Sequence, residues 1–150
     1  MYRKILVPLN GTKHAEVVLP HVAEIANGRE VDIILVRVAI PPEANLVTED
    51  PDCTLYTHPE TEAKCSDYLK PIAAHLREHT PQVEICVRSG LPAEVILNVA
   101  REIQADMLVI SKRKIHSALH SLHGCVAEKI LRQAHIPVLL IDATDRMAGG

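Results

Sequence analysis

Residues 105–141 read ADMLVISKRKIHSALHSLHGCVAEKILRQAHIPVLLI. The apolar run at 107–111 predicts a buried strand, the segment across 124–134 predicts a helix, and residues 138–141 predict a second strand. A strand, a helix and a strand in this order form a right-handed crossover between parallel strands. This stretch therefore favours a parallel sheet with helices packed against it.

The same alternation continues back to the N-terminus. Strands are expected at 4–9, 30–39 and 82–88, and helices at 12–26, 60–78 and 92–104. Thr12 caps the first helix, Asn27 and Gly28 end it, and Pro20 is expected to kink it. The strands are apolar throughout, as in sheets covered on both faces.

These elements predict a single doubly wound, Rossmann-like α/β domain with helices on both faces of a parallel sheet. The domain spans residues 1–142 and includes a long Pro-rich loop at 41–59. Residues 143–150 are expected to form a flexible tail.

Composition excludes several classes of protein. The chain has 150 residues and a net charge of −3, which suits one folded domain. With three Tyr and no Phe or Trp, it lacks the aromatic platform and the basic groove of nucleic-acid binders. No apolar run reaches the length of a membrane helix and no signal sequence precedes the first strand, so we expect a cytoplasmic protein without membrane contact. The four cysteines form no C-x-x-C pair and are expected to be free thiols.

Two segments lie where open α/β sheets bind ligands, outside the carboxyl ends of strands. The first is the turn that holds Pro8, Leu9 and Asn10, and the second runs from Ser111 through three consecutive cations to Gly124. Cations beside a helix start either favour a phosphate-bearing ligand or form a solvated turn. The sequence contains no P-loop, no G-x-G-x-x-G after the first strand and no G-x-S-x-G, which excludes the corresponding enzyme classes.

Several segments together resemble the universal stress protein family. They are RKILVPLNGT at 3–12, SGLP at 89–92, ADMLVI at 105–110, GCVAEKIL at 124–131 and IPVLL at 136–140. The resemblance covers essentially the whole chain. It implies a five-stranded sheet of order 3-2-1-4-5, of the adenine nucleotide alpha hydrolase-like type, a homodimer and no established catalytic reaction.

The ATP-binding motif of that family is altered in this sequence. The family pattern G-x2-G-x9-G-[ST] falls on Ser111, Lys114, Gly124 and Cys125, and the family's first-turn Asp falls on Asn10. Glycines let backbone amides approach phosphates, and a thiol donates more weakly than a hydroxyl. The resemblance thus implies either a degenerate site for ATP or another adenine nucleotide, held by the neighbouring cations, or a relative that binds no nucleotide.

Val38 resembles the strand residue that lines the adenine pocket in ATP-binding relatives, and otherwise it is a core residue. The candidate nucleotide-binding residues are Pro8, Leu9, Asn10, Val38, Ser111, Lys112, Arg113, Lys114, Gly124, Cys125 and Val126.

Two other groups of residues contain side chains that can bind metal or act as nucleophiles. His116, His120 and His123 have ligand types and a spacing that suit Zn²⁺ or Cu²⁺ on a helix, but in a chain with nine histidines we expect no metal site. Cys53, with Asp52 and His58 in the Pro-rich loop, matches no nucleophile signature.

A lone charge in the second strand, Arg37, is interpreted as lying near the rim of the sheet or as paired, and not as binding a ligand.

The last strand forms a wholly apolar sheet edge from Val138, Leu139, Leu140 and Ile141. Such an edge invites pairing with a second copy, so we expect an isologous homodimer through it. Two functions remain open: a non-enzymatic stress-response regulator with a degenerate nucleotide site, or a dimer that binds no nucleotide and acts through protein partners. Slow nucleotide hydrolysis is not expected, because neither a base nor a Mg²⁺-binding carboxylate is evident in the site.

Overall fold

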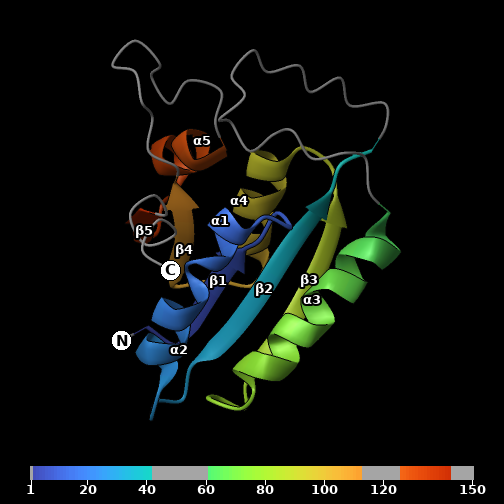
Figure 1. Cartoon of the computed structure of the whole chain (residues 1–150). Helices are drawn as coiled ribbons and strands as arrows, with labels where there is room; N and C mark the ends of the chain where they lie inside the picture. The colour runs from blue at the N-terminus through green and yellow to red at the C-terminus, as the bar shows by residue number, and fades with distance from the viewer. Residues whose placement is uncertain (1, 42–60, 113–125, 143–150) are drawn as a thin grey trace.

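The computed structural model describes residues 2–41, 61–112 and 126–142, which form one sheet and the helices around it (Figure 1). The strands are β1 (Lys4–Pro8), β2 (Asp32–Ala39), β3 (Val83–Ser89), β4 (Met107–Lys112) and β5 (Val138–Asp142). They lie in the order β3-β2-β1-β4-β5, and every neighbouring pair is parallel. The predicted sheet and its strand order are confirmed.

Helices cover both faces of this sheet, as predicted. One layer contains α1 (Lys13–Glu16), α2 (Leu19–Ala26) and α3 (Glu62–Leu76), and the other contains α4 (Pro92–Glu102) and α5 (Val126–Gln133).

Side chains alternate between the two layers along each strand. On β2, Ile33 and Leu35 belong to the core under α2 and α3, while Ile34 and Val36 belong to the core under α4 and α5. Because both faces of the inner strands are buried, most of their positions must be apolar. This requirement explains the continuous apolar runs in the sequence.

The predicted helix at 12–26 is two helices and not one kinked helix. Thr12 caps α1 as expected, since its Oγ1 accepts a hydrogen bond from the Ala15 N–H at 3.3 Å. Pro20 lies in the first turn of α2, has no N–H to donate to the Glu16 carbonyl, and the chain turns at 17–18 instead of continuing the helix. The effect of Pro20 is therefore a break, larger than the kink that we predicted.

At one point in the sheet, the chain leaves two neighbouring strands toward opposite faces. β1 and β4 are neighbours, but β1 leads into α1 on one face whereas α5, which follows β4 in the chain, lies on the other. The connections diverge at the carboxyl ends of these two strands, and a crevice forms there.

Residues 42–59 of the predicted Pro-rich loop and the predicted tail at 143–150 lie outside the described residues. None of the helices in the described part of the chain combines the length and the apolar character of a membrane span.

Candidate functional site

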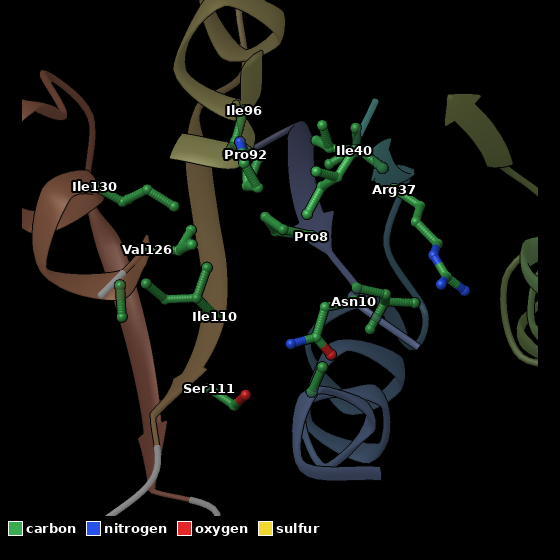
Figure 2. Close-up of a pocket in the computed structure, with 15 residues that line it drawn as sticks. Pro8, Asn10, Arg37, Ile40, Pro92, Ile96, Ile110, Ser111, Val126 and Ile130 are labelled. Atoms are coloured by element: carbon green, nitrogen blue, oxygen red, sulfur yellow. The ribbon is translucent and has the colours of Figure 1, made fainter. Parts of the chain in front are cut away.

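A cavity lies at the carboxyl ends of β1 and β4, where the strand order reverses (Figure 2). Its volume, counted with its open mouth, is about 770 Å³. The lining residues are Pro8, Leu9, Asn10, Ala15, Val36, Arg37, Val38, Ile40, Pro92, Ile96, Ile110, Ser111, Val126, Ala127 and Ile130. The cavity is therefore at the place where the sequence predicted a ligand.

The walls of the cavity are aliphatic. Val36 and Val38 come from one face of β2, Ile110 comes from β4, and Ile96 and Ile130 come from α4 and α5 on that same face of the sheet. Side chains of this kind remove water from an apolar ring without hydrogen-bonding to it. The polar side chains that line the cavity beside them are therefore the ones that can orient a ligand.

The Asn10 side chain is held in a defined orientation by the turn after β1. Its Oδ1 accepts hydrogen bonds from the Thr12 N–H at 3.0 Å and from the Thr12 Oγ1 hydroxyl at 2.6 Å. A backbone N–H can only donate, so this contact identifies the oxygen of the amide and leaves Nδ2 on its other side. Figure 2 shows the Asn10 nitrogen directed toward the Ser111 side of the cavity. Asn10 thus presents N–H donors to a ligand, where a carboxylate would present only acceptors.

Arg37 borders the cavity, but its side chain points away from it toward α3 (Figure 2). The residue is 6% exposed, and its guanidinium carbon lies 4.5 Å from the centre of the Tyr68 ring. A buried cation over an aromatic face is attracted by the ring quadrupole. The structure therefore agrees with the interpretation that Arg37 is paired and does not itself bind the ligand.

Tyr68 has an unusual environment beside this cation. Burial, together with the nearby Glu16 carboxylate, raises the pKa of the Tyr68 hydroxyl well above its ordinary value, and Arg37 offsets part of that rise. Tyr68 therefore stays neutral at physiological pH and cannot neutralise Arg37.

The structure brings together most of the predicted site residues that it describes. Lys112 is at the end of β4 but does not line the cavity. The predicted residues that line the cavity are Pro8, Leu9, Asn10, Val38, Ser111 and Val126. The predicted residues Arg113, Lys114, Gly124 and Cys125, the histidines His116, His120 and His123, and the loop residues Asp52, Cys53 and His58 lie outside the described residues.

Sequence reasoning missed much of the apolar wall. Helical spacing was the available signal, since Pro92 and Ile96 on α4, like Val126 and Ile130 on α5, are four residues apart and share a face. That spacing identifies a buried face but not the part of it that lies over a cavity. The missed lining residues are Ala15, Val36, Arg37, Ile40, Pro92, Ile96, Ile110, Ala127 and Ile130.

The predicted dimer edge is β5, which pairs with β4 on one side. Val138, Leu139, Leu140 and Ile141 are all half-buried in the single chain. The apolar edge is thus formed, whereas its pairing with a second copy stays a prediction.

Comparison with protein families gives a match along nearly the whole chain. The model of the universal stress protein family matches residues 1–142. A universal stress protein of Methanocaldococcus jannaschii is 24% identical over 142 residues, which cover 94% of this chain and 82% of that protein. Another, from Methanothermobacter thermautotrophicus, is 29% identical over 144 residues that cover 94% of this chain and 96% of the relative.

Solved structures share the same fold. A universal stress protein crystallised in complex with cAMP superposes with a TM-score of 0.72 at 17% identity, covering 95% of this chain and 98% of that chain. The universal stress protein from Archaeoglobus fulgidus in complex with dAMP gives a TM-score of 0.64 at 22% identity, covering 93% of this chain and 98% of the other.

Proposed function

The chain belongs to the universal stress protein family, and we propose that it binds an adenine nucleotide in the cavity at the carboxyl ends of β1 and β4. The observation that carries this proposal is the pairing of an aliphatic crevice with an oriented amide donor, Asn10, at the point where the strand order reverses. Two structural neighbours were solved in complex with adenine nucleotides, cAMP and dAMP, which supports this ligand class.

The chemistry of the lining suits the two halves of such a ligand. A flat, largely apolar base can pack against Val38 and Ile40, whereas the Asn10 amide can donate to oxygens of the sugar or phosphate. Val126 and Ala127, the first described residues of α5, line the cavity, and the N-terminal part of a helix favours a phosphate through its backbone dipole. Lys112, at the end of β4, adds positive charge nearby.

We assign the protein a regulatory role without catalysis. Among the described lining residues no carboxylate, histidine or thiol is present to act as a general base or to hold Mg²⁺. The site is therefore suited to binding a nucleotide and less suited to cleaving it. In this proposal the protein is a cytoplasmic stress-response homodimer that pairs through β5.

Calorimetric titration with AMP and with Mg²⁺-ATP tests the proposal. Wild-type protein, stripped of ligand, is expected to bind with one site per chain. Ala127→Phe places a ring in the cavity and is expected to abolish binding. Ala74→Phe adds the same ring on the exposed surface of α3 and is expected to leave affinity unchanged. Both changes are Ala to Phe in a helix, so a difference between them reports on the cavity.

A failure of the wild-type protein to bind either nucleotide up to about 1 mM, which corresponds to some 4 kcal/mol, would contradict the proposal. The function would then be the other one left open by the altered motif at Ser111, in which the dimer acts through protein partners.

A further inference from the structure

The turn that carries Asn10 is in contact with a buried group on the opposite face of the sheet. Gly11 has a φ of +86°, and a Cβ atom built on it would lie 2.8 Å and 2.9 Å from the two terminal nitrogens of Arg37. The guanidinium therefore packs directly against the backbone of the turn, and a side chain at residue 11 would require Arg37 to shift. The guanidinium also lies over the Tyr68 ring, 4.5 Å from its centre, so the turn and the ring contact the same cation.

The two sides of the sheet are linked through these contacts of Arg37. Arg37 follows Val36 and precedes Val38 on β2, and those two valines line the cavity while the Arg37 side chain points toward α3. The Leu9 N–H donates to the Val36 carbonyl at 2.9 Å, which joins the end of β1 to the same part of β2. The turn thus has the cavity on one side and the cation on the other.

We infer that Arg37 and Tyr68 are positioning residues, which fix the turn at Asn10, Gly11 and Thr12 so that the Asn10 amide faces the cavity. The planar guanidinium gives the turn a flat support that a flexible side chain cannot give. The expected effect of Arg37 and Tyr68 on nucleotide affinity rests on the proposed nucleotide site. Their expected effect on the conformation of the turn does not.

A double-mutant cycle between Gly11→Ala and Arg37→Met tests the contact. In the wild-type background the added methyl group meets the guanidinium, so Gly11→Ala is expected to weaken AMP binding about tenfold. In the Arg37→Met background the obstacle is gone, and the added effect of Gly11→Ala is expected to fall to about threefold or less. The positive φ at Gly11 penalises alanine equally in both backgrounds and cancels. Equal effects in the two backgrounds would overturn the inference.

Further variants distinguish the effect of the planar guanidinium from the effect of its charge and from a general loss of stability. Arg37→Lys keeps the charge but loses the plane, so it is expected to weaken AMP binding nearly as much as Arg37→Met does. Full affinity in Arg37→Lys would overturn the inference that the plane matters. Leu69→Val loosens the fully buried packing of α3 next to Tyr68 but changes neither Gly11 nor Arg37 nor Tyr68, and it is expected to leave affinity unchanged.

The mobility of the turn can be measured without ligand, which tests the inference independently of the proposed function. In ¹⁵N relaxation experiments the Gly11 backbone amide and the Asn10 side-chain amide are expected to become more mobile in Arg37→Met and Tyr68→Leu, but not in Leu69→Val. Unchanged mobility in Arg37→Met overturns the inference whether or not nucleotide binds. If the turn loosens while the wild-type protein binds no nucleotide, the positioning of the turn stands and the proposed function fails.

Discussion

At the scale of single residues, Asp106 shows how one carboxylate joins distant parts of the sheet. Its Oδ2 accepts hydrogen bonds from the Arg3 and Lys4 N–H groups, each at 2.9 Å, and its own N–H donates to the Lys4 carbonyl at 2.8 Å. These two backbone donors stabilise the charged form and hold the pKa of Asp106 below its ordinary value.

The depressed pKa predicts a direction of pH dependence. The contribution of Asp106 to stability is complete above the pKa of the unfolded chain, about 4, and is lost as the pH falls through the lower pKa of the folded protein. Asp106→Asn is therefore expected to lower the urea midpoint at pH 7, and the difference from wild type is expected to shrink in acid. Asp67→Asn, which removes an exposed carboxylate 3.7 Å from Lys70, should change the midpoint little. A deficit for Asp106→Asn that stays constant down to pH 3 would contradict this reasoning.

A second residue-scale prediction concerns Cys86 on β3. Partial burial raises the pKa of its thiol, and the nearby Glu102 carboxylate adds to the rise while Arg88 opposes it. Since the thiolate is the nucleophile, Cys86 is expected to react with iodoacetamide more slowly than a free thiol does at neutral pH, and to reach the free rate in urea. Peptide-level mass spectrometry after timed quenching measures both rates. A native rate as fast as the unfolded one would show that Cys86 is an accessible thiolate.

At the scale of helices, Thr12 and Thr61 form a natural pair of variants. Each caps a helix by accepting a hydrogen bond from an N–H three residues later, at 3.3 Å in α1 and 3.2 Å in α3. Replacing either by Ala is expected to cost about 1 kcal/mol of unfolding free energy. Thr12 also holds Asn10, so Thr12→Ala should in addition weaken AMP binding, whereas Thr61→Ala should not.

Urea denaturation and calorimetry on the same samples separate the two effects. Equal losses of affinity in both variants would mean that binding follows overall stability and not the orientation of Asn10.

The elements also show how far the sequence determines the structure. Apolar runs predicted the inner strands and β5, because a strand buried on both faces has to be largely apolar, whereas β3 at the edge of the sheet carries the exposed Glu84 and Arg88. The residue types of Thr12 and Asn27 indicated the two caps. The sequence predicted a disturbance of the helix at Pro20, but as a kink and not as a break. Sequence alone does not tell whether packing will hold a helix together across a proline.

The site was less predictable than the strands for a physical reason. Asn10 comes shortly after β1 and Ser111 is the second-last residue of β4, and the end of a strand is a local property of the sequence. The lining by Ile96 and Ile130 depends on how two helices sit over the sheet, which no local pattern encodes. The support of the turn by Arg37 depends on a contact between β2 and the Gly11 backbone across strands. Alternation along β2 does predict that Arg37 lies on the face opposite Val36 and Val38. It does not predict which groups Arg37 contacts there.

At the scale of the whole molecule, the two edges of the sheet differ. On β3 the exposed positions include Glu84, Arg88 and Ser89, and charged edges of this kind discourage pairing. On β5 the residues before Asp142 are apolar and half-buried. The contrast predicts that a second copy pairs with β5 and not with β3.

Proline substitutions test this prediction at matched positions. The Leu108 N–H donates to the Pro137 carbonyl, and the Ile33 N–H donates to the Gln82 carbonyl. In a parallel strand both backbone groups of a residue point the same way and alternate along the chain, so the N–H groups of Leu140 and Val87 point outward from their edges.

Leu140→Pro is therefore expected to remove an outward donor from β5 and convert the dimer to a monomer, while Val87→Pro leaves the dimer intact. Sedimentation velocity at tens of micromolar measures the outcome, and far-ultraviolet circular dichroism checks that both variants are folded. A wild-type protein that sediments as a monomer, or a folded Leu140→Pro variant that stays dimeric, would show that β5 is not the interface. The apolar edge would then have to be covered within the chain itself, because a parallel sheet leaves few alternatives for an unpaired apolar strand.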